Sequence, residues 1–299
     1  MGYKLVPVKG STYYLDGAVK IGIIKNEKKP TASIIIDTGI DDDSGRRIIK
    51  IMQENGMGPG VIINTHSHAD HCGGNSIIKS RTGAKVYAPH FDRAIIEYPE
   101  LEAFYLYSAN PLSEMDTKFL KAKASKVDYI LEEGELEVEG IKLGILPLHG
   151  HTPAMIGVVT PDNVLFAGDA FFSQDILGKH GLPYFTDIGK TLETLEYIKG
   201  LDYDYFIPCH GDALQDPSDV IASNIQILRD ITGFIADWCV EALDREQIAS
   251  RLIERFDIKL SIPQYYLTVS TVSAFLSYMT DEKILGTLFE DNRLKFVRL

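Results

Sequence analysis

Short apolar stretches recur along the first two thirds of the chain, and each is followed by a polar loop. The predicted strands are residues 32–36, 61–64, 142–148, 164–167 and 203–208. Helix-like stretches lie between several of them, at residues 44–54, 75–81 and 190–199. Strands and helices mixed in this order predict an α/β architecture. Because α/β sheets usually keep their chemistry at the C-terminal ends of their strands, the loops after these five strands are where a site is expected.

Residues 91–129 do not follow this pattern. They contain the aromatic run FYLY at 104–107, then Asn110-Pro111 and a charged, helix-like run. One interpretation is a helical excursion that packs on the sheet. The other is a lid whose aromatic side chains line a substrate pocket, and the two are compatible.

The last part of the chain predicts a separate unit, so we divide the chain into domains at 1–215 and 216–299. Residues 217–240, 245–256 and 265–279 read as helices, and 284–290 with 293–299 read as a β-hairpin turning at Asp291-Asn292. Helices followed by a terminal hairpin resemble a winged-helix unit. From residue 242 to the end, eight basic side chains balance eight acidic ones. A neutral unit of this kind is a poor duplex binder and a better packing or homodimer module.

Composition places the chain among globular proteins, with 45% hydrophobic and 24% charged residues. The formal net charge of −12 argues against a function in nucleic-acid binding, which needs a surplus of Lys and Arg. No apolar run approaches the length of a membrane span, and the first residues do not resemble a secretory signal. Three cysteines imply no disulfide framework, so we expect a cytoplasmic protein.

The strongest chemical signal is the run THSHADHCGG at residues 65–74. Within six positions it carries four potential metal ligands: His66, His68, Asp70 and His71. Four such side chains cannot point the same way from one helix or strand, but they can converge when a loop wraps around ions. His66 and His68 suit one ion, and Asp70 with His71 suits a second. Zinc accepts imidazole nitrogen and carboxylate oxygen, and iron and manganese tolerate them.

Further candidate ligands follow the later predicted strands. They are His151 in GHTP at 150–153, Asp169 after Gly168, and His210 in CHGD at 209–212. Asp37 lies earlier, in the DTG turn at 37–39. Over roughly residues 10–215 this ordered series resembles that of the metallo-β-lactamase superfamily. The series is specific for the superfamily but not for any substrate.

The resemblance implies a four-layer αβ/βα sandwich of two similar halves, with the site at one edge between the sheets. It also implies ligand roles: His66, His68 and His151 for the first metal, Asp70, His71 and His210 for the second, and Asp169 as the bridge. Asp37 resembles the structural aspartate of the family. We expect Asp37 to accept hydrogen bonds from the ligand loop and hold it in place.

Such a site needs no protein nucleophile. Two dications about 3.5 Å apart share a water whose pKa falls from ~15.7 toward neutrality, and they polarise the scissile carbonyl or phosphoryl group. Asp70 and Asp169 are therefore the predicted catalytic carboxylates, both acting as ligands. Cys72 and Cys209 are expected to pack as small buried residues.

The remaining histidines carry weaker signals. The sequence around His151 favours it over His149, for which we expect a role in the loop. His180 and Tyr184 lie in a loop between two ligand motifs. They are candidates for substrate contacts, although a surface position is the default for such a histidine. His90 reads as structural.

The leading functional hypothesis is hydrolysis of a small ester, thioester or lactone with two divalent ions, zinc above iron or manganese. Hydroxyacylglutathione hydrolases and quorum-signal lactonases are similar proteins, and no residue set selects between them. β-Lactam hydrolysis is disfavoured because antibiotic-degrading enzymes usually work outside the cytoplasm. A small-molecule substrate is expected, with neither nucleic acid nor membrane as a partner.

Three other functional classes stay open: nucleases, redox enzymes of two kinds, and a non-enzymatic regulator or scaffold. Ribonuclease-type members of the superfamily cleave phosphodiesters, but the net charge and the neutral tail weigh against this reading. Sulfur dioxygenase relatives use a single iron, whereas this chain keeps Asp70, His71 and His210 of the second site. Flavin-linked di-iron relatives place a glutamate where this chain has His68. A regulator or scaffold with a vestigial site is disfavoured by the intact ligand set.

Overall fold

The computed structural model describes residues 3–299 and divides into two compact units. The first unit contains the chain up to Leu148, together with Ala154–Asp169 and Leu201–Pro217. The second unit contains His149–Pro153, Ala170–Gly200 and Ser218–Leu299. The predicted domain division at residue 215 stays a prediction, since residues 170–200 group with the C-terminal part here.

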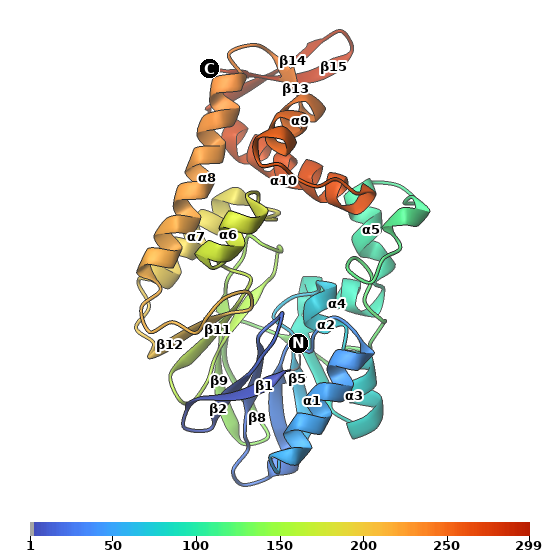
Figure 1. Ribbon diagram of the computed structural model, residues 1–299, viewed down its shortest axis with the longest axis vertical. Coiled ribbons are helices and arrows are strands. Elements are labelled where there is room, and N and C mark those ends of the chain that lie inside the picture. Colours follow the sequence, from blue (N-terminus) through green and yellow to red (C-terminus); the bar gives the residue numbers. More distant parts are fainter. Residues whose placement is uncertain (1–2) are drawn as a thin grey trace. The chain divides into compact units, whose positions relative to one another are not determined.

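The first unit contains a seven-stranded sheet that begins antiparallel and becomes parallel (Figure 1). In spatial order its strands are β1 (Lys4–Lys9), β2 (Thr12–Asp16), β3 (Ile21–Ile24), β4 (Ser33–Ile36), β5 (Pro59–Ile63), β6 (Lys85–Pro89) and β7 (Tyr129–Leu131). Strands β4 to β7 run parallel, so their C-terminal ends meet at one edge. The 3₁₀ helix η1 (Pro30–Ala32) precedes β4.

A second, five-stranded sheet completes the strand framework of the first unit. Its order is β12 (Tyr205–Pro208), β11 (Val164–Gly168), β10 (Ile156–Val159), β9 (Ile141–Pro147) and β8 (Gly134–Val138). Only β11 and β12 are parallel. All five strands predicted from the apolar stretches are therefore present, two of them in the first sheet and three in the second.

The two sheets share an apolar core. Residues from the first sheet, such as Ile34 and Ile63, form one buried cluster with residues from the second, such as Val158 and Phe166. Strand β4 is buried along its whole length, which explains its continuous apolar sequence. The other face of the first sheet packs on α1 (Asp42–Glu54) and α3 (Asn75–Thr82), with Ile48 at the centre of a second cluster.

Residues 90–128 contain less helix than their sequence suggests. Helices α4 (His90–Glu97) and α5 (Glu100–Tyr107) form, followed by the short 3₁₀ helix η2 (Ser113–Met115). The charged run that was expected to be helical is irregular from residue 116 to 128. That expectation was wrong because this run buries Leu120 and Val127 from an irregular backbone while its lysines pair with neighbouring elements, as Lys123 does with Asp42.

The second unit is mostly helical. It contains α6 (Gln174–His180), α7 (Ile188–Lys199), α8 (Ser218–Trp238), α9 (Arg245–Arg255) and α10 (Ile262–Asp281). A small sheet of β13 (Leu243–Asp244), β15 (Arg293–Arg298) and β14 (Leu285–Glu290) follows. Strands β14 and β15 form the predicted hairpin, and Asp291 and Asn292 adopt the left-handed conformation that its tight turn requires.

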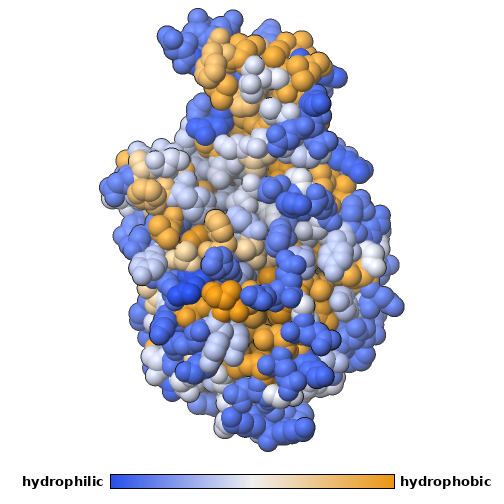
Figure 2. Space-filling model, turned by 180° about the vertical axis from the view of Figure 1, so that it is seen from behind, coloured by the Kyte–Doolittle hydropathy of each residue, from blue (hydrophilic) through white to orange (hydrophobic). Residues whose placement is uncertain are grey.

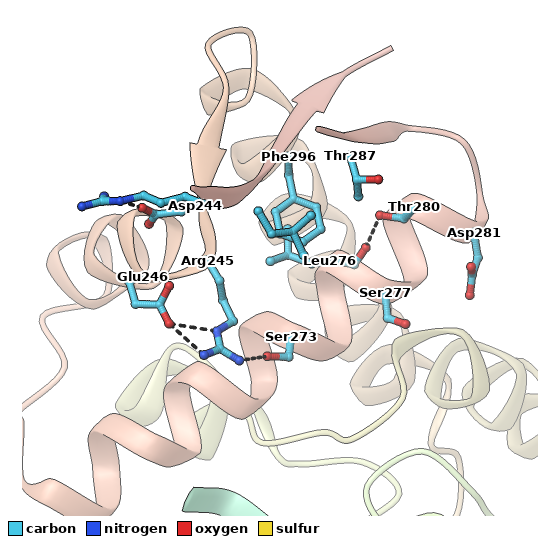
Figure 3. A pocket seen from close by; sticks show the side chains of 12 residues that line it. Asp244, Arg245, Glu246, Ser273, Leu276, Ser277, Thr280, Asp281, Thr287 and Phe296 are labelled. Atoms are coloured by element: carbon cyan, nitrogen blue, oxygen red, sulfur yellow. Dashed lines mark hydrogen bonds and ion pairs between the residues drawn. The ribbon is translucent and has the colours of Figure 1, made fainter. Parts of the chain in front are cut away.

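The C-terminal hairpin presents apolar side chains at its surface. Phe289 is 82% exposed, and Leu294 and Leu299 are also exposed. Figure 2 shows hydrophobic residues gathered on the surface of the hairpin. A cavity of about 820 Å³ lies between α10 and the hairpin, with Phe296 on its wall and Arg245 bonded to Glu246 and Ser273 at its edge (Figure 3). Within residues 3–299, no helix has the length and apolar character needed to cross a membrane.

Candidate metal centre

Four strand ends of the first unit deliver Asp37 and three of the candidate ligands. Asp37 follows β4 and His66 follows β5, which are parallel neighbours in the first sheet. Asp169 follows β11 and His210 follows β12, which are parallel neighbours in the second sheet. These candidate residues therefore lie just after the C-terminal ends of strands. The short helix α2 (Ala69–Cys72) carries Asp70 and His71.

Asp37 organises the loop that carries the histidines. It is fully buried with φ of 63°, a left-handed conformation that is uncommon outside glycine. Its carboxylate accepts hydrogen bonds from the backbone N–H and the hydroxyl of Thr65, both at 2.8 Å, and from Nδ1 of His71 at 2.8 Å. One carboxylate therefore holds the start of the ligand loop and the last of its ligand side chains.

These contacts determine which nitrogen of His66 is available. The hydroxyl of Thr65 donates its only proton to Asp37, because a carboxylate can only accept. The same hydroxyl oxygen lies 3.0 Å from Nδ1 of His66 and accepts the proton there. The lone pair of a neutral His66 is then on Nε2, which faces Nδ1 of His68 at 3.1 Å.

In His71 and His210, too, a hydrogen bond from Nδ1 leaves Nε2 available. His71 donates from Nδ1 to Asp37, and His210 donates from Nδ1 to the carbonyl oxygen of Ala18 at 3.2 Å. In both residues Nε2 points toward carboxylates. It lies 3.5 Å from Oδ2 of Asp169 in each case, and 3.8 Å (His71) and 3.4 Å (His210) from Asp70.

Burial and charge shift the pKa values in this cluster. Burial would raise the pKa of Asp70, but His71 and a hydrogen bond from His210 outweigh it and hold the value at about 2. Burial would lower the pKa of His71, yet the carboxylates of Asp169, Asp70 and Asp37 around it raise the pKa well above its usual value. The pKa of His210 is raised against burial by Asp169 and Asp70. The cluster therefore attracts positive charge.

The residues of the first unit fit divalent ions. Within this unit three groups of three potential ligand atoms converge, with all atoms of a group within 4.8 Å: His66, His71 and Asp169; Asp70, His71 and His210; and Asp37, His71 and Cys209. Nε2 of His71 is buried and has no hydrogen-bond partner among residues 3–299. A buried lone pair directed at two carboxylates is stabilised by a cation between them, and the nitrogen–oxygen set suits zinc.

Two glycines let the ligand loop approach the turn that carries Asp37. A Cβ atom on Gly74 would lie 2.4 Å from the carbonyl oxygen of Thr38, and one on Gly73 would lie 2.1 Å from that of Ile40. Real side chains do not tolerate these distances. The Gly-Gly pair at the end of the motif is therefore needed for packing, so that α2 can end and α3 can start against the turn.

His151 lies in the second unit, although both neighbouring segments, up to Leu148 and from Ala154, belong to the first. Its Nδ1 donates to the carbonyl oxygen of Tyr184 at 2.8 Å, which leaves the lone pair of a neutral ring on Nε2. The carbonyl of His149 accepts a hydrogen bond from Thr194. The side chain of His180, a predicted substrate contact, lies outside the described residues.

The cysteines beside the ligands are buried. Sγ of Cys209 lies 3.6 Å from Oδ2 of Asp37, and Sγ of Cys72 donates to the carbonyl oxygen of Ser67. Burial raises the pKa of both thiols far above the usual range, so they remain protonated. Neutral, buried thiols are poor nucleophiles, as expected from the sequence.

Some supporting residues were not found by sequence reasoning. Thr65 sets the protonated nitrogen of His66, and the carboxylate of Asp92 accepts from the backbone N–H of Ser67 at 2.9 Å. Glu102 on α5 lies 3.7 Å from Nε2 of His68. Burial and the nearby Asp92 raise the pKa of Glu102 to about 7, against a hydrogen bond from Tyr105.

Comparison with known families identifies the domain. The model of the metallo-beta-lactamase superfamily matches residues 16–210, well over half of the chain. The chain belongs to this superfamily. The predicted resemblance is therefore confirmed, and the matched region includes every candidate ligand.

Individual relatives are distant. The Beta-lactamase-like protein 2 homolog of Drosophila melanogaster is 26% identical over 187 residues, which cover 62% of this chain and 56% of that protein. A hydroxyacylglutathione hydrolase of Haemophilus influenzae is 29% identical over 169 residues, covering 54% of this chain and 70% of that protein. The matched region thus spans little more than half of the Drosophila relative.

Solved structures with the same fold match the chain over its whole length. A metallo-beta-lactamase family protein from Thermus thermophilus aligns with a TM-score of 0.75 and 18% identity, covering 100% of this chain and 99% of that chain. At this identity the likeness shows the fold alone. It confirms the predicted α/β fold of the metallo-β-lactamase type with a helical C-terminal extension.

Proposed function

We propose that this superfamily member is a metal-dependent hydrolase that binds two divalent ions and cleaves a small ester, thioester or lactone. The observation that carries the proposal is a hydrogen-bonding pattern shared by three histidines in the first unit. His66, His71 and His210 each engage Nδ1 with an oxygen acceptor, which leaves Nε2 available as a ligand atom. Such a pattern is typical of metal-binding histidines.

The proposed ligands follow the family pattern. His66, His68 and His151 would hold the first ion, Asp70, His71 and His210 would hold the second, and Asp169 would serve both. The hydrogen bond from His151 to the carbonyl of Tyr184 supports its role, because it leaves Nε2 as the ligand atom. What the ions supply when bound is Lewis acidity, which makes hydroxide available at neutral pH and polarises the substrate carbonyl.

The chain's own residues hold this site in its reactive state. The low pKa of Asp70 keeps it ionised as a ligand throughout the physiological range. Asp169 carries the charge that offsets repulsion between two cations, and its position on the strand end limits its movement. In this proposal Asp70 and Asp169 are the catalytic carboxylates, and Asp37 positions the loop around them.

The substrate class rests on relatives and on charge. A relative named hydroxyacylglutathione hydrolase supports a thioester as the first substrate to test. The net charge of −12 disfavours a polyanionic substrate such as RNA. We also propose a cytoplasmic location, supported by three free, buried cysteines, and a homodimer formed through the exposed apolar hairpin residues Phe289 and Leu299.

The test is metal analysis of protein purified without chelators, combined with thioester, lactone and phosphodiester substrates. We expect two equivalents of zinc and turnover of one acyl class. Asp169→Asn should lower kcat/KM by more than about a hundredfold. Asp202→Asn, which changes an exposed aspartate in the same unit, should not.

Three results would contradict the proposal. A single equivalent of iron with oxygen consumption would favour the dioxygenase class. Phosphodiester cleavage with RNA binding that weakens as salt rises would favour the nuclease class. Full activity after complete metal removal would end the metal-dependent interpretation.

A further inference from the structure

Two buried acids from the helical excursion contact the ligand loop. Asp92 on α4 is 1% exposed and accepts from the backbone N–H of Ser67, the residue between His66 and His68. Glu102 on α5 is 4% exposed, and its Oε1 lies 3.7 Å from Nε2 of His68. Both contacts lie within the first unit.

The geometry around His68 assigns its two nitrogens to different partners. Nδ1 faces Nε2 of His66 at 3.1 Å, where the first ion is proposed to bind. Nε2 faces Glu102 on the other side of the ring. When Nδ1 of a neutral imidazole is a ligand, Nε2 carries the proton and directs a positive edge outward.

Only one of the two carboxylate oxygens of Glu102 accepts a hydrogen bond within the described residues. Its Oε1 accepts a hydrogen bond from the hydroxyl of Tyr105 at 2.7 Å. Its Oε2 is buried and has no hydrogen-bond partner in the described part of the chain, residues 3–299. Burying a carboxylate in this way is costly unless nearby positive charge compensates it.

The proposed first ion would provide that charge. The first ion has only neutral ligands of its own, namely His66, His68 and His151. The second ion has a charged ligand that it does not share, the carboxylate of Asp70. Glu102 is a buried acid placed beside His68, one of the ligands of the first ion. At 3.7 Å its contact with His68 is electrostatic rather than a hydrogen bond.

We propose that Glu102 is a positioning residue for the first metal, which orients His68 and raises its strength as a ligand. The inference rests on the proposed function and deepens it, because it makes the helical excursion a supporting part of the metal site. Carboxylates behind ligand histidines act in this way in other metal sites, and their loss typically costs 10–100-fold in metal affinity.

The decisive variant is Glu102→Gln, which keeps the shape and an acceptor oxygen but removes the charge. We expect one of the two zinc equivalents to bind about tenfold more weakly in competition with a chromogenic chelator. Cobalt-substituted protein should show a changed visible absorption spectrum. The matched control is Glu100→Gln, which removes an exposed carboxylate from the same helix and should leave both affinities unchanged.

The stability of the metal-free Glu102→Gln variant, compared with that of the metal-free parent, distinguishes a positioning role of Glu102 from a packing role. A positioning role predicts that metal-free Glu102→Gln is at least as stable as the parent, because an uncompensated buried charge is gone. Weaker zinc binding together with unchanged or higher metal-free stability supports the proposal. Unchanged zinc affinity, equal weakening of both equivalents, or a fall in metal-free stability would overturn it. Failure of the parent to bind two equivalents would instead contradict the proposed function.

Discussion

Nδ1 of His71 lies 2.8 Å from Oδ2 of Asp37, and both side chains are completely buried. This pair connects the turn after β4 to the end of the ligand loop, 34 residues later in the chain. Because a carboxylate accepts the Nδ1 proton, Nε2 of His71 is left to face Asp70 and Asp169. The position of one aspartate thus determines the chemistry of a histidine that comes from another element.

Asp37→Asn tests this relationship. An amide cannot accept at both of its ends, so one buried donor from Thr65 or His71 would lose its partner. We expect the free energy of unfolding to fall by about 2–4 kcal/mol and zinc affinity to fall about 10–100-fold. Urea unfolding and chelator competition measure the two effects. Asp43→Asn, at an exposed aspartate of α1, is the control, and equal behaviour of the two variants would refute the assigned role.

His210→Ala removes a ligand of the proposed second ion and changes no residue of the loop at 65–74. We expect the variant to retain one tightly bound zinc and lose the other, since His66 and His68 remain. Metal content after dialysis, measured by atomic emission, gives the stoichiometry. His90→Ala removes an exposed histidine at the start of α4 and should still bind two. Two tightly bound equivalents in His210→Ala would show that this histidine is not a ligand.

Gly74→Ala and Gly233→Ala should change stability in opposite directions. The new Cβ at residue 74 would lie 2.4 Å from the carbonyl oxygen of Thr38, whereas nothing lies within 4 Å of that at residue 233. We expect a loss of about 1–3 kcal/mol for Gly74→Ala from overpacking. Gly233→Ala lies within α8 and should gain about 0.5–1 kcal/mol from helix propensity. Denaturant unfolding gives both values, and a neutral Gly74→Ala would mean that the turn can move away.

The ion pair of Lys79 and Asp128 should make stability depend on acid pH. Partial burial would raise the pKa of Asp128, but hydrogen bonds from Lys79 and from the backbone N–H of Val86 lower it below its usual value. A lowered pKa stabilises the folded state above the unfolded value of about 3.9, and this contribution disappears as the pH falls through the folded value.

Asp128→Asn measures that contribution. We expect the variant to be about 1 kcal/mol less stable than the parent from pH 5 to 8, with the gap closing below about pH 3.9. Urea unfolding at several pH values tests this on metal-free protein, so that ligand protonation does not interfere. A difference that persists unchanged at pH 2.5 would mean that packing rather than charge is responsible.

Much of the fold was predictable because the apolar patterns are local. The expected helix at 44–54 forms as α1 from Asp42, and the expected hairpin turns at Asp291 and Asn292. The charged run after Pro111 was predicted wrongly. Its lysines favour helix when considered alone, but burial of Leu120 and Val127 and ion pairs with α1 decide its backbone.

The sequence alone was enough to identify the superfamily and its candidate ligands, because His66, His68, Asp70 and His71 stand within six positions and the others follow strands in order. It could not decide which nitrogen of each histidine is available. That depends on oxygens that come from distant segments: Asp37 and the carbonyl groups of Ala18 and Tyr184, which accept hydrogen bonds, and Glu102 on α5, which acts through its charge. Only folding brings these oxygens to the rings, since hydrogen bonds and charges act over a few ångströms of space and not along the chain.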